Sequence, residues 1–220
     1  SADLRLKGKL TVPIEGTKFP VVILVHGSGP QDMDLTIGPN RVFKDIAIEL
    51  AAYGFAVIRF DKRTKAYQSE MALMLPSMTP DDETMQDVLA AIKFAEGNEF
   101  VDSKKMFILG HSFGGMMAPR IALLSKKING MILMAANARP LQILLMDQLR
   151  YLAQADSANP AMRESLDLMQ EKVDRVSMKS YDETTDPMLL AMGIGYPYWQ
   201  YLDDYDQFMQ AIAVQSPMLR

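Results

Sequence analysis

The feature that most constrains the fold is a regular change of hydrophobic rhythm over residues 4–134. Pro20–Val25 is a continuous apolar run that is typical of a buried strand. Three further short apolar runs predict strands: Phe55–Phe60, Met106–Leu109 and Gly130–Met134. Three segments carry apolar side chains at helical spacing: Arg41–Tyr53, Asp81–Glu96 and Phe113–Ser125. Strands that alternate with helices form parallel sheets covered by helices, so the sequence predicts an α/β fold.

The two ends of the chain show different patterns. Leu4–Pro13 alternates apolar and polar residues, which indicates an edge strand. After Arg139 we expect helices at Leu141–Gln154 and Ala161–Val176, followed by an aromatic segment that glycines and prolines interrupt. This change predicts three parts: a core over residues 1–138, a helical cap or lid inserted over 139–215, and the start of a further core segment at 216–220.

Composition argues against several classes of function. The 220 residues include no cysteine, which excludes disulfides, thiolate metal sites and a cysteine nucleophile. Lysine and arginine number 23 against 27 acidic residues, so no basic surplus favours a nucleic-acid partner. No apolar run reaches the roughly 18–20 residues of a membrane helix. We therefore expect no membrane span and a soluble protein, either cytoplasmic or exported after removal of a signal.

Gly110–Gly114, with the sequence GHSFG, matches the pattern G-x-S-x-G. An expected strand runs directly into this segment and an expected helix begins inside it, which is the arrangement of a nucleophile elbow. Such a turn exposes the hydroxyl of Ser112 at a helix N-terminus, where the dipole and backbone N–H groups favour the negative charge of acyl transfer. The pattern predicts Ser112 as a catalytic nucleophile; the alternative is a glycine-rich turn with an incidental serine.

His26–Pro30, with the sequence HGSGP, follows another buried strand at the same carboxyl edge of the sheet. Its two glycines allow backbone N–H groups to point at an oxyanion. Together with the GHSFG turn, the loop predicts an oxyanion hole formed by the N–H of Phe113 and the N–H of Ser28 or Gly29, and we assign it to Phe113 and Ser28. The alternative is an ordinary tight turn.

Three segments resemble, in this order, bacterial carboxylesterases of the α/β-hydrolase superfamily, related to its serine aminopeptidase-like and dienelactone hydrolase-like groups: VVILVHGSGPQDMD, IGPNRVFKDIAIELAAYGFAVIRFDKRT and MFILGHSFGGMMAPRIA. The region 139–215 resembles the helical cap of such esterases. The resemblance implies a serine hydrolase that cleaves short-chain carboxylic esters through an acyl-enzyme, without cofactor or metal. A serine peptidase, an acyltransferase and a non-catalytic ligand-binding domain of this fold remain alternatives.

The chain has only two histidines, and neither is placed to be the catalytic base. In this fold the nucleophile is followed along the chain by the acid and then by the histidine. His111 adjoins Ser112 and is expected to pack beneath the turn, while His26 is expected to hold its own loop by hydrogen bonds. We therefore expect the triad acid and base to lie outside this sequence, in a protein heavier than 24.6 kDa.

This expectation has two consequences. The chain as given is predicted to turn over little or no ester, because an unactivated serine is a weak nucleophile. A parallel sheet that stops at this point would leave an open apolar edge, which another chain or an oligomer would cover.

Several charged residues allow both a functional and a structural interpretation. Asp61–Arg63 follows an expected strand, and we favour a salt-bridged loop over contact with an anionic substrate. Asp32 and Asp34 are expected to be turn and cap residues rather than cation ligands. The acidic start of the helix 81–96 suits the helix dipole. The acids of the last third are interpreted as solvated cap residues: Asp203, Asp204 and Asp206.

Overall fold

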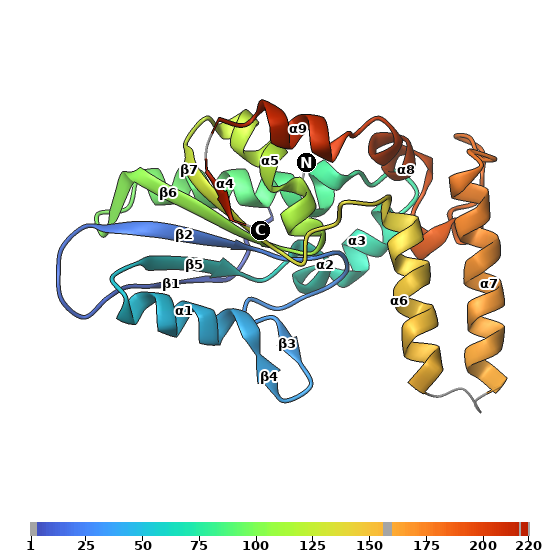
Figure 1. The fold of residues 1–220 in the computed structure, drawn as a ribbon, viewed down its shortest axis with the longest axis horizontal. Coiled ribbons are helices and arrows are strands. Elements are labelled where there is room, and N and C mark those ends of the chain that lie inside the picture. The colour runs from blue at the N-terminus through green and yellow to red at the C-terminus, as the bar shows by residue number, and fades with distance from the viewer. Residues whose placement is uncertain (1–3, 156–159, 216, 220) are drawn as a thin grey trace. The chain divides into compact units, whose positions relative to one another are not determined.

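The computed structural model describes residues 4–155, 160–215 and 217–219 (Figure 1). Contacts divide the chain into two compact units. The core unit comprises Ser1–Met71, Asp81–Ala136 and Gln207–Arg220. The helical unit comprises Ala72–Pro80 and Asn137–Asp206. The predicted α/β architecture is therefore found in one unit, and the predicted run of helices makes up most of the other.

The core unit is built on a six-stranded sheet. In spatial order its strands are β1 (Gly8–Thr11), β5 (Ala56–Phe60), β2 (Phe19–Val25), β6 (Val101–His111), β7 (Ile128–Met134) and β8 (Met218–Leu219). β1 pairs antiparallel with β5, and the other neighbours are parallel. The predicted edge strand, the buried strand β2 and the three other predicted strands are confirmed, although β6 is longer than predicted. The parallel pairing brings the ends of β2 and β6 to the same edge.

Helices cover both faces of this sheet (Figure 1). On one face, α1 (Val42–Ala52) packs Phe43 and Ala47 against Val22, Leu24 and other apolar side chains of the strands. On the opposite face lie α4 (Gln86–Glu96) and α5 (Phe113–Ser125), and the short α9 (Gln207–Ala213) packs on α5. Because β2 is buried on both faces, its sequence is continuously apolar rather than alternating.

The structure departs from the predicted elements between β5 and α4. Two short helices that the sequence analysis did not assign follow β5: α2 (Arg63–Ala66) and α3 (Gln68–Met74). The helix predicted over residues 81–96 is α-helical only from Gln86, because its first turn is the π-helical η1 (Asp81–Met85). Wider turns of this kind occur often at functional sites, and Glu83 in this one is buried. The sequence indicates only that the acids of this segment suit the helix dipole.

The helical unit contains a pair of long helices, α6 (Leu141–Ala155) and α7 (Pro160–Ser177), which lie side by side (Figure 1). Two 3₁₀ turns, η2 (Pro187–Leu189) and η3 (Ala191–Gly193), lead to α8 (Tyr196–Asp203). The indole of Trp199 is buried and donates to the carbonyl oxygen of Ile194 at 3.1 Å. That this unit acts as a cap stays a prediction. None of the helices within the described ranges is both long and apolar enough to cross a membrane.

Candidate active site

Ser112 occupies the turn between the end of β6 and the start of α5. Its backbone has φ 53° and ψ −117°, a region that residues other than glycine rarely adopt. Two hydrogen bonds hold it there: its N–H donates to the carbonyl oxygen of Met134 on β7 (2.9 Å), and its own carbonyl accepts the N–H of Met116 on α5 (3.0 Å). The neighbouring strand and the following helix thus impose a strained conformation on this serine.

Close backbone contacts explain the glycines on either side of Ser112. A Cβ atom on Gly110 would lie 2.5 Å from the carbonyl oxygen of Gly114. A Cβ atom on Gly114 would lie 2.4 Å from the carbonyl oxygen of His26 and 2.5 Å from that of Val25. These distances are too short for any side chain, so the GHSFG turn packs directly against the end of β2.

The loop after β2 lies beside Ser112. A Cβ atom on Gly27 would lie 3.2 Å from the Cβ of Ser112 and 3.5 Å from Nδ1 of His111. We call residues His26–Gly29 the HGSG loop. The structure therefore brings the two segments that the sequence analysis singled out into direct contact.

A buried ion pair holds the HGSG loop in place through hydrogen bonds. The Nζ of Lys62 donates to the carbonyl oxygen of Gly27 (2.6 Å) and to Oε1 of Glu83. The same Oε1 accepts the N–H of Gly29 at 2.9 Å. The side chains of Lys62 and Glu83 are only 3% and 1% exposed. Burial lowers the pKa of Lys62, and the charge of Glu83 opposes that shift.

A further hydrogen bond supports this loop, and a second ion pair lies next to Lys62 in the sequence, with no hydrogen bond to the loop among the described residues. The hydroxyl of Thr64 donates to the carbonyl oxygen of Gly29 at 3.1 Å. Arg63, beside Lys62, forms a two-pronged pair with Asp87, with N···O distances of 2.8 and 2.5 Å. The favoured interpretation of Asp61–Arg63 as a salt-bridged loop is confirmed. Sequence reasoning missed the contact of Lys62 with the HGSG loop. The signal that could have found it is a lysine directly after a buried strand, because a buried ammonium group needs a carboxylate partner.

His26 is a structural residue of the same loop. It is 2% exposed, and its Nε2 donates to the carbonyl oxygen of Asp32 at 2.8 Å. Its ring also packs on Phe43 and Phe60, with centroids 4.8 and 5.9 Å away. Burial lowers its pKa to about 4, so the imidazole is neutral near pH 7. The prediction that His26 holds the loop by hydrogen bonds is confirmed.

The two aspartates that follow this loop have structural partners. Oδ1 of Asp32 accepts the N–H groups of Asp34 (3.1 Å) and Thr36 (3.0 Å), which is a side-chain-stabilised turn. Asp34 pairs with the guanidinium of Arg59 at 3.0 Å. The structure bears out their interpretation as turn and cap residues.

Neither histidine of the chain hydrogen-bonds the hydroxyl of Ser112 within the described residues. His111 is half-buried, burial lowers its pKa, and its Nδ1 has no hydrogen-bond partner in the described part of the chain. Ser112 therefore has neighbours that could stabilise charge, namely the HGSG loop and the start of α5, but no base among these contacts.

Comparison with known proteins decides the family. Residues 19–190 match the family model described as serine aminopeptidase, S33. The chain belongs to this α/β-hydrolase family. The esterase EstD of Thermotoga maritima is 37% identical over 97% of this chain. That alignment covers 48% of EstD, so the chain spans about half the length of this relative.

Two solved structures resemble the S33-family chain. The acetyl xylan esterase from Paenibacillus sp. R4 matches 97% of this chain and 62% of its own, with a TM-score of 0.56 and 14% identity. The acylaminoacyl peptidase of Pyrococcus horikoshii matches 66% of this chain and 23% of its own, with a TM-score of 0.52 and 28% identity. The α/β-hydrolase fold predicted from the sequence is thereby confirmed.

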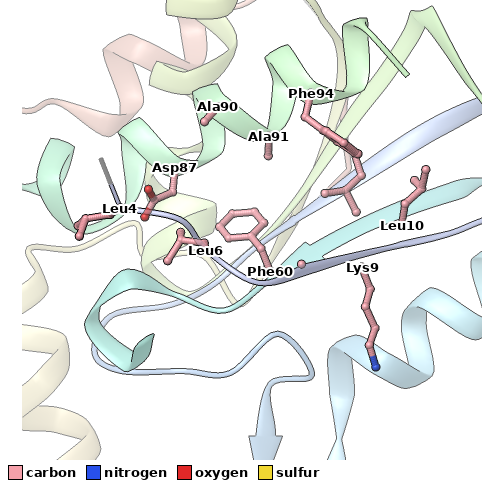
Figure 2. A pocket seen from close by; sticks show the side chains of 11 residues that line it. Leu4, Leu6, Lys9, Leu10, Phe60, Asp87, Ala90, Ala91 and Phe94 are labelled. Atoms are coloured by element: carbon pink, nitrogen blue, oxygen red, sulfur yellow. The ribbon is translucent and has the colours of Figure 1, made fainter. Parts of the chain in front are cut away.

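Other charged and hollow features of the S33-family chain occur in each of its two units. In the helical unit, Asp203 accepts the hydroxyl of Tyr181 at 2.9 Å and lies 3.4 Å from Nζ of Lys179. A cavity of about 330 Å³ lies between β1, β5 and α4, and Figure 2 shows its apolar lining, with Lys9 pointing away. No group of three or more potential metal ligands gathers within the described ranges.

Proposed function

We propose that the chain forms the nucleophile-bearing part of a serine hydrolase that cleaves short-chain carboxylic esters. In this proposal Ser112 attacks the ester carbonyl and forms an acyl-enzyme. The observation that carries it is the strained turn, which presents this serine between the end of a strand and the N-terminus of α5. The relationship to the esterase EstD supports ester over other acyl substrates.

The oxyanion hole is formed by the N–H groups of Phe113 and Ser28. Phe113 is the first residue of α5, where the helix dipole favours negative charge. On the HGSG loop, the N–H of Gly29 is bonded to Glu83. Within the described residues no hydrogen bond uses the N–H of Ser28, which supports Ser28 over Gly29.

The general base and its orienting acid come from outside residues 1–220 in this proposal. His26 is neutral, buried and bonded to Asp32, and His111 has no hydrogen bond to Ser112. The chain by itself is accordingly expected to react slowly with esters, because deprotonation of the serine would be unassisted.

Peptide or amide hydrolysis at the same serine is the second candidate function. The observations that favour it are the family, described as serine aminopeptidase, and the likeness to an acylaminoacyl peptidase. Both reactions pass through an acyl-enzyme and an oxyanion, so the geometry of Ser112 alone does not separate them.

A fluorophosphonate probe tests the nucleophile in the full-length protein. We expect labelling of the wild type and none of Ser112→Ala. Ser125→Ala is the matched control, because that hydroxyl lies at the far end of α5 and donates to Ala122. Labelling that persists in Ser112→Ala would place the nucleophile elsewhere, and an unlabelled wild type would favour a binding domain. Rates on nitrophenyl esters and aminoacyl nitroanilides then separate esterase from peptidase.

A further inference from the structure

We propose that Lys62 and Glu83 are positioning residues for the oxyanion donor Ser28. Their buried ion pair fixes the direction of the Ser28 N–H and strengthens it as a hydrogen-bond donor. This inference rests on the proposed function, because it assigns a role within the oxyanion hole of that reaction.

One peptide group connects Lys62 to the oxyanion donor. The carbonyl of Gly27 and the N–H of Ser28 belong to the same peptide unit, in which the two bonds point in opposite directions. The Nζ of Lys62 lies 2.6 Å from that carbonyl oxygen. By holding the oxygen on one side, the ammonium group fixes the N–H on the other.

The charge of Lys62 also polarises the same peptide group. A charged donor on a carbonyl oxygen forms a stronger hydrogen bond than a neutral donor. Hydrogen bonds in a chain strengthen one another, more so where the local dielectric is low. With Lys62 only 2% exposed, its charge draws electron density toward the Gly27 oxygen and makes the Ser28 N–H a better donor to a developing oxyanion.

Glu83 determines which N–H group of the loop can face the oxyanion. Its Oε1 binds both Lys62 and the N–H of Gly29. The second of these bonds removes the Gly29 N–H from the set of groups that could face the oxyanion. Glu83 thereby keeps the ammonium in place and leaves the neighbouring Ser28 N–H as the donor on this loop.

A role in positioning also explains why a buried ion pair is present here. Replacing such a pair by uncharged groups of similar size is often neutral or stabilising, because desolvation opposes the Coulomb attraction. The void beside the pair, lined by His26, Thr84 and Val88 among others, measures about 10 Å³, room for a single water. This void therefore offers the pair little hydration, and the hydrogen bonds of the pair to the loop supply its remaining polar contacts.

The test is the double variant Lys62→Met/Glu83→Gln in the full-length protein. Glutamine retains an oxygen that can accept the Gly29 N–H, so the variant removes the charges with little change in shape. Loss of one oxyanion donor lowers kcat by about 100- to 1,000-fold. For a donor that is present but misaligned and less polarised, we expect kcat to fall about 10- to 100-fold, with KM changed less than about twofold.

The matched control is Arg63→Met/Asp87→Asn, which removes the adjacent buried ion pair. Arg63 and Asp87 have side chains 10% exposed, and neither has a hydrogen bond to the HGSG loop among those that the described residues form. We expect this variant to shift the thermal midpoint by a similar amount while kcat stays within about threefold of wild type. An equal loss of kcat in both double variants would overturn the proposal, since the effect would then be one of stability.

Amide hydrogen exchange tests the clamp without activity. In Lys62→Met/Glu83→Gln we expect faster exchange of the Gly29 N–H, which is bonded to Glu83 in the wild type. In the Arg63→Met/Asp87→Asn control we expect the exchange rate of this N–H to be unchanged. Unchanged exchange and unchanged kcat would overturn the proposal. If the wild type hydrolyses no ester, the esterase proposal fails, while exchange still decides whether the pair holds the loop. Should the double variant not fold, Glu83→Asp, which keeps both charges and withdraws the carboxylate by one methylene group, gives the same comparison, with kcat expected to fall about three- to tenfold.

Discussion

Two turns lie side by side at the carboxyl edge of the sheet, and they are held in place in opposite ways. The GHSFG turn is shaped by the absence of side chains, because backbone atoms of β2 lie where a Cβ of Gly114 would be. The HGSG loop is held by side chains that come from elsewhere. Lys62 and Thr64 are 35 residues from the groups they bind in this loop, and Glu83 is 54 residues from the N–H that it accepts.

This difference separates two kinds of sensitivity. The GHSFG turn depends on steric fit, which is all or nothing and lies within the packed core. The HGSG loop depends on several hydrogen bonds, each of which contributes modestly and can be weakened alone. Substitutions in the turn should therefore disturb the fold as a whole, whereas single changes around the loop should each cost less stability and also change the reactivity of Ser112.

Gly114→Ala should have the largest effect. Its methyl group would lie 2.4 and 2.5 Å from two carbonyl oxygens of the backbone, which can move only if β2 and α5 separate. We expect a loss of about 3 kcal/mol or more in the free energy of unfolding, measured by urea denaturation. Gly97→Ala serves as the control, because the nearest atoms to its Cβ would be two carbonyl oxygens at 4.0 Å, an ordinary contact distance. Equal stability of the two variants would show that the turn tolerates a side chain.

A change of pH should weaken the HGSG loop through His26. The pKa of this histidine is about 4 in the folded protein and 6.5 in an exposed chain. Between these values the unfolded state binds the proton and the folded state does not, so stability is lost as pH falls from about 6.5 to 4. The shift corresponds to about 3 kcal/mol.

The measurement compares unfolding free energies at pH 7 and pH 4. In His26→Gln, which keeps a donor for the carbonyl of Asp32, this part of the acid-induced loss should disappear. His111→Gln should keep it, because His111 is only half-buried. Parallel pH curves for wild type and His26→Gln would contradict the neutral, buried state of His26.

The comparison also explains what could be predicted from the sequence. The GHSFG turn was recognisable because strand, glycine spacing and helix are adjacent in the chain, and the sheet followed from the same local periodicity. The partners of the HGSG loop could not be recognised in the sequence, because Glu83 lies in an acidic segment whose composition suits a solvated helix start. Only the fold turns that segment, through the π-helical η1, so that Glu83 is buried against Lys62.

Gly27→Ala tests the boundary between the two turns. Its Cβ would lie 3.2 Å from the Cβ of Ser112, a crowded distance that a shift of a few tenths of an ångström relieves. We expect a loss of stability of about 1–2 kcal/mol and a clear slowing of fluorophosphonate labelling. Gly130→Ala is the matched control, since its Cβ would lie 3.1 Å from Phe107 on the neighbouring strand, away from Ser112. The same slowing in both variants would mean that crowding of the core, rather than displacement of the loop, controls reactivity.

The smallest effect is expected from two threonine-to-valine changes that remove one hydroxyl each. Thr64→Val leaves the carbonyl of Gly29 without its donor and should lower the free energy of unfolding by about 1 kcal/mol. Thr84 is 4% exposed, and its hydroxyl has no hydrogen-bond partner within the described residues. Thr84→Val replaces a buried polar group by a methyl of nearly the same size, so stability should be unchanged or rise by up to about 1 kcal/mol. If chemical denaturation shows a lower unfolding free energy for Thr64→Val and an equal or higher one for Thr84→Val, the loop depends on individual hydrogen bonds. A decrease in both variants would mean that steric fit controls the loop, as it controls the GHSFG turn.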